Sequence, residues 1–356
     1  IIQLYTHFKH PINNDIYQIL HEAVDADDLK KLVVYKSVKT GKIWVRPYDE
    51  FFSEVGQRVP RFLLSTLKNN FDVQYLTLTN EILKNGRVKT DRTGTGTISI
   101  TSYTFDIDVS ESLPVLTIKK TNYKSILDEL IWFLSGSTNS NKLNTRIWDA
   151  NSTTDFLTKR GLDYPQGYIG PAYGYQWRGK SMIEGDLQWN GTQYATEGIN
   201  GPDQIRYVIN EIMNNSDSRR ILISNWDAKN INKMALPPCH LLFQVIVRDD
   251  YLDGIMYQRS ADLFLGVPFN VASYATLLYI LANVTNKKPG RLVVHFGDVH
   301  IYSNHITQAK SLNDLPIYDS PTLAISGLLN IDGLKSSSFE LQNYKCGPWI
   351  KAEMAI

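Results

Sequence analysis

A cysteine in an unusual local setting is the first candidate for chemistry. Cys239 lies in the segment Leu-Pro-Pro-Cys-His, in which two prolines fix the approach of the backbone and His240 follows directly. The thiolate is the reactive form of cysteine, and nearby cationic groups stabilise it by lowering the thiol pKa. Most lone cysteines are instead inert buried residues. Cys346 has no comparable surroundings in the sequence, and we interpret it as incidental.

Four arginines lie in polar segments that could bind an anion. They are Arg92, in the Gly- and Thr-rich segment 91–97, Arg219 and Arg220, which precede an apolar run, and Arg259, next to Ser260. A guanidinium group binds phosphate through two parallel hydrogen bonds, so it suits phosphate better than an ammonium group does. The alternative for each arginine is a surface ion pair. Segment 91–97 lacks the Gly-Lys-Ser/Thr ending of a Walker A loop, so it does not support triphosphate binding by that device.

Four further polar residues have both a structural and a functional interpretation. Glu129 lies in an otherwise apolar helical segment, so its carboxyl group is either at an exposed edge or buried with a raised pKa that suits proton transfer. Asn270 precedes a helical segment, where it could cap the helix or read an amide-like edge of a ligand. His300 and Tyr302 alternate after Gly-Asp and could present two hydrogen-bonding groups on one face of a strand.

Composition argues against several other classes of protein. The chain has 356 residues, a formal net charge of +1, 43% hydrophobic and 21% charged residues, as is typical of a globular protein with a sizeable core. Near-neutral charge argues against nucleic-acid binding through phosphate neutralisation. We expect no metal site, because HExxH and CxxC motifs are absent, and no membrane span, because no apolar run approaches roughly 20 residues. Two cysteines and no opening secretory segment predict a reducing, cytoplasmic setting, which would be the host cytoplasm for a viral protein.

The first 66 residues have their own pattern and are predicted to form a small, mostly β domain. Three runs rich in Ile, Val and Tyr, 16–23, 31–38 and 42–46, predict strands, the last two as a hairpin, and 48–55 predicts one short helix. A small aromatic core is predicted from Tyr5, His7, Phe8, Tyr35 and Trp44, with a binding role as the alternative. The order of these segments resembles DUF1653, a family of unknown function.

Residues 70–356 are predicted to form a larger α+β domain. Apolar spacing predicts helices over 75–84, 125–134, 203–212 and 271–284, and strands over 98–109, 220–224, 241–247, 255–257 and 292–296. Strands and helices alternate irregularly, which favours one large sheet over a regular βαβ repeat. Residues 177–202 are rich in Gly, Asn, Gln and Thr and are predicted to form an exposed insertion.

Nine segments of this larger domain, in order, resemble the thymidylate synthase family. They are DRTGTGT (91–97), DELIWFLSGSTN (128–139), RIWDAN (146–151), GPAYGYQWR (170–178), SRR (218–220), MALPPCH (234–240), YQRSADLFLGVPFNVASYA (257–275), GDVHIYSNH (297–305) and IKAEMAI (350–356). An ordered series of this kind is far more specific than one motif. The resemblance implies the fold of that family, a large mixed sheet packed with helices.

The resemblance also implies a reaction and the residues that carry it out. Cys239 would add to C6 of dUMP, and C5 would then take up the one-carbon unit of 5,10-methylenetetrahydrofolate, with Glu129 relaying protons near O4 and Tyr173 helping to remove the C5 proton. The resemblance also implies which residues bind the nucleotide. The phosphate would be bound by Arg92, Arg219, Arg220, Arg259 and Ser260, the ribose by His300 and Tyr302, and the pyrimidine by Asn270, with His240 also in contact with the nucleotide. The folate would be bound by Lys119, Trp148, Asp262, Gly266 and Ala355, and Arg259 and Asp262 would also be catalytic.

The same resemblance implies an obligate homodimer whose Arg219 and Arg220 reach the partner's site, and a C-terminal tail that closes the site. Closure distinguishes two activities, because the exocyclic methylene intermediate is open to attack by water. Hydride from tetrahydrofolate gives dTMP and dihydrofolate, whereas water gives 5-hydroxymethyl-dUMP and tetrahydrofolate, the products of a dUMP hydroxymethylase. Asn270 favours dUMP over dCMP in either enzyme, since cytosine presents the opposite donor pattern.

Some positions favour the synthase and others depart from it. Trp148 and the complete tail 351–356 favour the reductive outcome. Ile118 and Lys120 stand where the family usually has Thr and Arg, and segment 344–348 replaces a Pro-His-Pro approach to the tail.

A hypothesis of another class is a tethered fusion, in which residues 1–66 bind RNA, DNA or a protein partner. The mixed charges of those residues form no clear basic face.

Overall fold

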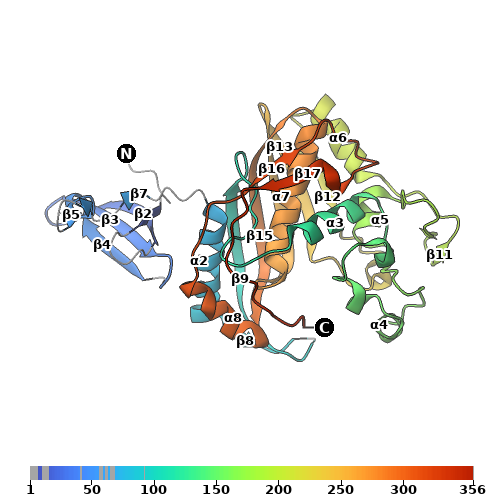
Figure 1. Ribbon diagram of the computed structural model, residues 1–356, viewed down its shortest axis with the longest axis horizontal. Coiled ribbons are helices and arrows are strands. Elements are labelled where there is room, and N and C mark those ends of the chain that lie inside the picture. Colours follow the sequence, from blue (N-terminus) through green and yellow to red (C-terminus); the bar gives the residue numbers. More distant parts are fainter. Residues whose placement is uncertain are drawn as a thin grey trace.

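The computed structural model describes residues 7–9, 16–40, 42–55, 59–60, 63–64, 69–91 and 93–355. They form a small N-terminal module beside a larger domain built on one mixed sheet packed with helices, which confirms the predicted fold class (Figure 1). Four positions with predicted roles are affected by the gaps: Tyr5, Arg92 and Ile356 lie outside the described residues, and the His7 side chain is not described.

The N-terminal module is a five-stranded sheet with a short helix on one side. Its strand order is β4-β3-β2-β1-β7, and β5 pairs with β6. The bounds are β1 His7–Lys9, β2 Ile16–Val24, β3 Lys31–Ser37, β4 Ile43–Pro47, α1 Tyr48–Phe51, β5 Glu54–Val55, β6 Val59–Pro60 and β7 Leu63–Leu64. The three predicted strands and the hairpin are confirmed. The predicted helix over 48–55 is wrong beyond residue 51, because β5 leaves the helix to pair with β6.

The core of the module is smaller than predicted. Phe8 and Tyr35 are buried as expected, together with Ile19, Val33 and Phe51. Trp44 is 37% exposed, which corrects its assignment to the core. It lies on the edge strand β4 and stacks on Tyr35 with ring centroids 6.0 Å apart, so it covers the core from outside.

The turn after β3 joins the module to the larger domain. Val38 is 3% exposed and belongs to the hydrophobic core of that domain. The Asn80 side chain of helix α2 (Asn70–Asn85) donates to the carbonyl oxygen of Lys39 at 3.0 Å and exchanges hydrogen bonds with Asn313 at 2.9 Å. The Lys39 ammonium group lies 3.8 Å from the Asp314 carboxylate. The module is therefore packed against the larger domain at α2 and at the turn 312–314.

The larger domain is built on a six-stranded sheet in the order β12-β13-β14-β15-β9-β8. The bounds are β8 Arg87–Lys89, β9 Thr97–Asp108, β12 Leu222–Ser224, β13 His240–Arg248, β14 Tyr251–Asp262 and β15 Lys288–Tyr302. Strands β14 and β15 run parallel, and the other neighbours are antiparallel. Strands β14 and β15 are much longer than predicted. Their ends are rich in polar residues, so the apolar pattern that predicted each strand covers only its middle.

Helices cover one face of this sheet, and α7 (Gly266–Val284) is the central one (Figure 1). α7 packs on β14 and β15, α2 packs on β9, and α3 (Tyr123–Leu134) packs on α7. The remaining elements are η1 Ser140–Lys142, η2 Asp149–Asn151, α4 Thr154–Lys159, α5 Gly174–Arg178, β10 Gln188–Trp189, β11 Tyr194–Ala195, α6 Gln204–Asn214, η3 Ile231–Lys233, η4 Ser303–His305, α8 Ile306–Ser311, η5 Leu312–Asp314, β16 Thr322–Ile325, η6 Ser336–Ser338 and β17 Phe339–Gln342.

Helix α7 corrects two expectations. It begins at Gly266, so Asn270 lies inside the helix and not at its N-cap. Its 19 residues are long and apolar enough to cross a membrane by length and composition, although no such run was expected. Of its most apolar stretch, 72% is buried between the sheet and α3, which is the environment of a core helix in a globular domain.

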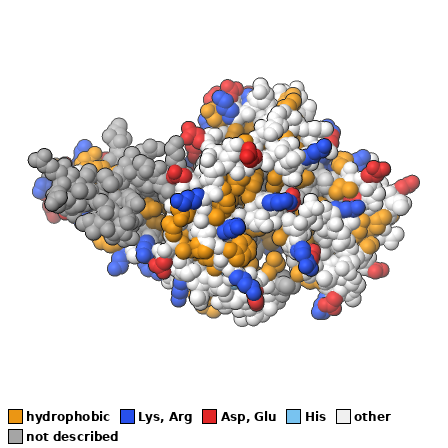
Figure 2. All heavy atoms as spheres, viewed as in Figure 1, with side chains coloured by type: hydrophobic (Ala, Val, Ile, Leu, Met, Phe, Trp, Pro, Cys, Tyr) orange, Lys and Arg blue, Asp and Glu red, His pale blue; other side chains and the backbone are white. Residues whose placement is uncertain are grey.

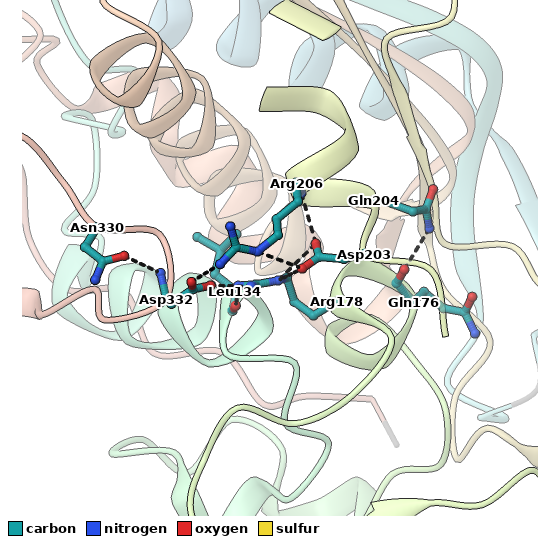
Figure 3. A network of polar contacts seen from close by, with 8 residues as sticks. All are labelled: Leu134, Gln176, Arg178, Asp203, Gln204, Arg206, Asn330 and Asp332. Carbon is teal, nitrogen blue, oxygen red and sulfur yellow. Dashed lines mark hydrogen bonds and ion pairs between the residues drawn. The ribbon is translucent and has the colours of Figure 1, made fainter. Parts of the chain in front are cut away.

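The segment 177–202 is not simply an exposed insertion, because its first residues lie in the core. The Arg178 side chain is 0% exposed and forms ion pairs with Asp203 at 3.1 Å and with Asp332 at 2.5 Å. It also donates to the carbonyl oxygen of Leu134, the last residue of α3, at 2.7 Å. Arg206 contacts the same two carboxylates from the surface (Figure 3). Arg178 therefore ties α3, α5, α6 and the loop at Asp332 together.

We expect Arg178→Met to lower the free energy of unfolding by about 3 kcal/mol, because the partly exposed carboxylates of Asp203 and Asp332 lose their buried partner and the buried Leu134 carbonyl oxygen loses its donor. Urea unfolding at neutral pH measures the change. Arg206→Met is the matched control: that side chain is 59% exposed and contacts the same acids, so its loss should cost under about 1 kcal/mol. Equal losses in both variants would contradict the central place of Arg178.

Candidate active site

The backbone at Cys239 is held from two sides. Its N–H donates to the Tyr173 hydroxyl at 2.9 Å, and its carbonyl oxygen accepts the Arg259 N–H at 2.9 Å. The Arg259 guanidinium donates to the carbonyl oxygens of Pro238 and Pro237, both at 2.9 Å, and one of its nitrogens lies 3.9 Å from the thiol sulfur. The two prolines thus present carbonyl groups that hold an arginine against the thiol, and this cation favours the thiolate.

Tyr173 occupies a strained position at the start of α5. Its φ is +27°, which side-chain-bearing residues rarely adopt, and its ring is buried against Phe133 at 4.8 Å and His240 at 4.6 Å between centroids. Burial raises the pKa of the Tyr173 hydroxyl well above its ordinary value, so the group is neutral. Since the oxygen already accepts from Cys239, its own proton remains to be donated to another group.

Glu129 is half-buried, which is closer to the buried one of its two predicted alternatives. It lies on α3, and its carboxylate accepts a hydrogen bond from the Trp148 indole at 2.7 Å. Burial raises the pKa of Glu129 from 4.5 to about 7. The Trp148 ring lies 5.9 Å from the Tyr173 ring, so the acid and the tyrosine share one aromatic wall. A carboxyl group with this pKa can both give and take a proton near neutral pH.

His240 is held as a neutral ring behind the thiol. Its Nδ1 lies 2.9 Å from the Tyr274 hydroxyl, and burial lowers the pKa of the imidazole to about 3. The buried Asn225 amide donates to the His240 carbonyl oxygen at 2.9 Å. His240 therefore contributes no positive charge, and Arg259 is the cation next to Cys239. Sequence reasoning missed Asn225 and Tyr274, because their partners are far away in the chain.

Gln258 was also missed, and it orients Asn270. The Gln258 amide nitrogen donates to the Asn270 side-chain oxygen at 3.0 Å and to the Ser260 carbonyl oxygen at 3.1 Å. With its oxygen turned towards Gln258, the Asn270 amide directs its nitrogen elsewhere. Gly266 lies next to this pair: a Cβ there would be 3.6 Å from the Asn270 oxygen.

The parallel pairing of β14 and β15 brings the predicted ribose and folate residues together. Asp262 is opposite His300 in the register, and the rings of His300 and Tyr302 lie 5.1 Å apart. His300 Nδ1 lies 2.9 Å from Asp298, and this hydrogen bond, helped by Lys89, lowers the pKa of Asp298 to about 2. Burial raises the pKa of Asp262.

Lys119 approaches the same place from another segment. Its buried ammonium group donates to the Phe264 carbonyl oxygen at 2.7 Å and lies 4.1 Å from the centre of the Phe264 ring. Burial lowers its pKa to about 8. Because Phe264 follows Asp262 by two residues and its N–H donates to the Asp262 carboxylate at 3.0 Å, the predicted folate residues Lys119 and Asp262 are connected through one short turn.

Arg219 and Arg220 are not brought to Cys239 within one chain. Both are exposed and precede β12, in which Ser224 pairs with Leu242 and the Ile221 carbonyl accepts from Val245. The arginines therefore lie beside the far part of β13, roughly 20 Å along the strand from Cys239 at 3.3 Å per residue. Among the described residues no group of three or more His, Cys, Asp or Glu side chains could hold a metal ion.

Comparison with known proteins gives consistent matches for both parts of the chain. A family model described as Thymidylate synthase matches residues 73–356, and one described as Protein of unknown function (DUF1653) matches residues 3–64. Thymidylate synthase from Homo sapiens is 40% identical over 80% of this chain and 91% of that protein. The same protein from equine herpesvirus 2 is 40% identical over 80% of this chain and 98% of its own length.

Longer relatives match over the same part. The bifunctional dihydrofolate reductase-thymidylate synthase of Paramecium tetraurelia is 40% identical over 80% of this chain and 61% of that protein. The bifunctional enzyme of Plasmodium berghei is 41% identical over 81% of this chain and 49% of its own length. The chain thus spans about half to three-fifths of the length of these bifunctional relatives.

The raised pKa of Glu129 makes a prediction about stability. An acid whose pKa rises from 4.5 to about 7 on folding keeps its proton in the fold after the unfolded chain has lost it. The free energy of unfolding therefore falls as pH rises from about 4.5 to 7, and the lost stability is not regained above pH 7. Glu129→Gln keeps the acceptor for Trp148 without the cost of ionisation, so at pH 8 it should stabilise the fold by on the order of 2–3 kcal/mol.

At pH 4.5 the same substitution should change stability little. Urea unfolding at both values measures the difference, and exposed Glu340→Gln is the control, for which we expect no such pH dependence. A Glu129→Gln variant that gains the same stability at both pH values would show that ionisation of this carboxyl is not the cause.

Proposed function

The chain belongs to the thymidylate synthase family, and from that premise we propose that it methylates dUMP at C5, with 5,10-methylenetetrahydrofolate as the source of the one-carbon unit and of the hydride. The observation that carries the proposal is the contact of the Arg259 guanidinium with the Cys239 thiol, on a backbone that Tyr173 fixes. This arrangement supports nucleophilic attack by a thiolate at a fixed position.

The steps of the proposed reaction use the groups around the thiol. Cys239 sulfur bonds to C6 of the uracil ring, and the electron pair of the C5–C6 double bond passes towards C5 and O4. C5 then bonds to the methylene carbon of the folate. Tyr173 and Glu129 supply the proton transfers: the first helps to remove the C5 proton, and the second exchanges protons near O4 through water. The pKa of about 7 supports this role for Glu129.

The final step leaves the methyl group on C5. Departure of folate nitrogen gives an exocyclic methylene, hydride from tetrahydrofolate adds to it, and Cys239 leaves C6 with its electron pair. The folate is oxidised to dihydrofolate. The hydroxymethylase alternative, in which water adds instead, is not favoured by the relatives that match this chain.

Recognition of the nucleotide is proposed for residues on β14, α7 and β15. Gln258 holds the Asn270 oxygen, so the Asn270 amide nitrogen is available to donate to O4 of uracil, while the second lone pair of that oxygen can accept from N3–H. Arg259, Ser260 and Arg92 bind the phosphate, with His240 behind the thiol. His300 and Tyr302 bind the ribose. Lys119, Trp148, Asp262, Gly266 and Ala355 contact the folate.

The site is proposed to be completed by a second copy of the chain. Arg219 and Arg220 lie too far from Cys239 along β13 to reach it in the same subunit. The sheet face opposite the helices carries exposed apolar side chains, among them Ile246 and Tyr257, which are 43% and 40% exposed. A homodimer that joins these faces covers them and brings the arginines of one subunit to the phosphate of the other.

The face in Figure 2 does not support a nucleic-acid partner. Basic and acidic side chains are interspersed over the larger domain in this view, whereas a surface that neutralises phosphates gathers basic groups. We therefore propose dUMP, folate and a second subunit as the partners. We also propose the cytoplasm as the location.

Product analysis tests the proposed function. Incubation of the protein with dUMP and 5,10-methylenetetrahydrofolate should give dTMP and dihydrofolate in equal amounts, as separated by chromatography. Cys239→Ser should lower turnover by about 10⁴-fold or more, because a hydroxyl group is a far weaker nucleophile near neutral pH, and should leave dUMP binding intact by calorimetry. Substantial turnover in the serine variant would rule out the covalent route.

Mixing of two inactive variants tests the shared site. Neither Cys239→Ser nor the double variant Arg219→Ala/Arg220→Ala should turn over dUMP efficiently. Refolded together in equal amounts they form heterodimers that contain one intact site, which should restore about a quarter of the wild-type activity. If the arginines act within their own subunit, each heterodimer site carries a defect and mixing restores nothing.

A further inference from the structure

The C-terminal tail is anchored where it leaves the body of the larger domain. The Tyr344 hydroxyl accepts the Thr121 N–H at 2.9 Å and donates to the Leu116 carbonyl oxygen at 2.7 Å. The Gly347 N–H donates to the Thr117 carbonyl oxygen at 2.7 Å. A Cβ on residue 347 would lie 2.3 Å from the Ile118 carbonyl oxygen, so only glycine permits this approach. The tail therefore begins in a fixed direction, next to the loop that carries Lys119.

A second anchor holds the tail near its end. The carbonyl oxygen of Glu353 lies 2.7 Å from His305 Nε2 and accepts a further hydrogen bond from the Asn304 side chain at 3.2 Å. A carbonyl oxygen only accepts, so Nε2 of His305 carries the proton. We define these two side chains as the latch. Both belong to the single turn η4, which directly follows the strand with His300 and Tyr302.

His305 is fixed in place by the site. Its side chain is fully buried, and its ring contacts Phe264 at 5.5 Å and Tyr302 at 5.9 Å between centroids. Its other ring nitrogen is buried with no hydrogen-bond partner among the described residues. The imidazole therefore acts through its hydrogen bond to Glu353, which joins a fixed wall of the site to a tail in which Lys351, Glu353 and Met354 are exposed.

The turn η4 also contacts the segment that contains Arg92. The Ser303 N–H donates to the Gly96 carbonyl oxygen at 3.0 Å. Three residues in succession thus bind the segment 91–97, through Ser303, and the tail, through Asn304 and His305. This turn stands between the parts proposed to hold phosphate, ribose and folate.

We propose that Asn304 and His305 are positioning residues that hold the tail closed over the site and so determine the product. The inference rests on the proposed function. A closed tail keeps water from the exocyclic methylene until hydride from tetrahydrofolate reaches it. With the tail released, the oxygen of water bonds to the methylene carbon and gives up a proton, Cys239 leaves, and folate remains tetrahydrofolate, so no oxidation or reduction occurs.

The test compares three latch variants. His305→Phe keeps the aromatic packing and removes the donor, Asn304→Ala removes the second donor, and His305→Gln restores a donor near the position of Nε2. Loss of one neutral hydrogen bond shifts an open–closed equilibrium by about fivefold to tenfold. We therefore expect the ratio of 5-hydroxymethyl-dUMP to dTMP to rise by about that factor in the first two variants, and further when they are combined.

Two controls separate the latch from loss of structure. Asn210→Ala, an exposed asparagine on α6, should leave the product ratio as in the wild type, and His305→Gln should lie closer to the wild type than His305→Phe. Trypsin cleavage after exposed Lys351, followed by mass spectrometry, reports the release of the tail without any turnover and should be faster in His305→Phe and Asn304→Ala.

The outcomes distinguish the two proposals. If the wild-type protein makes no dTMP, the proposed function fails, whereas the cleavage assay still tests the anchor. If the wild type makes dTMP and the folded double variant keeps both its product ratio and its cleavage rate, the latch is wrong. Faster cleavage with an unchanged product ratio would overturn control of the product by these residues.

Discussion

The hydrogen bond between the Tyr173 hydroxyl and the Cys239 N–H connects the nucleophile to the rest of the larger domain. Tyr173 begins α5, and Arg178, which ends that helix, is bonded to the end of α3 and to the acid that caps α6. Glu129 lies on the same α3. The distance between the thiol and the acid is therefore set by a rigid block of short helices, and the strain at Tyr173 is borne by the packing of this block.

Burial shifts the pKa values of the acid and of the imidazole at the site in opposite directions. The same apolar wall raises the pKa of Glu129 to about 7 and lowers that of His240 to about 3. Each group thereby prefers its neutral form. The charge next to the thiol is therefore supplied by Arg259. A histidine next to a cysteine in sequence is often taken for its base; here it is a packed, neutral support.

Sequence patterns predicted the elements whose apolar periodicity is strong, such as α3 and the first strands of the module. The sequence patterns gave wrong element bounds where polar residues interrupt the apolar periodicity. Strands β14 and β15 continue past their apolar runs to carry polar groups, and Asn270 lies inside α7 because the helix starts within the Gly-Val-Pro segment. Family motifs identified residues such as Cys239 and Asn270. Two of these motifs also contain Gln258 and His305, but they assigned no role to either residue, because those roles depend on partners brought near only by folding.

Val38 shows that the N-terminal module contributes structurally to the larger domain's core. A domain joined only by a flexible linker can be removed without altering its neighbour, but here a residue from the β3–β4 turn belongs to the core of the larger domain. The Asn80 amide on α2 likewise donates to a carbonyl group of the β3–β4 turn. The boundary between the two cores therefore does not coincide with the boundary between the two sequence families. A truncation made at the family boundary would open a hole in the part that it was meant to isolate.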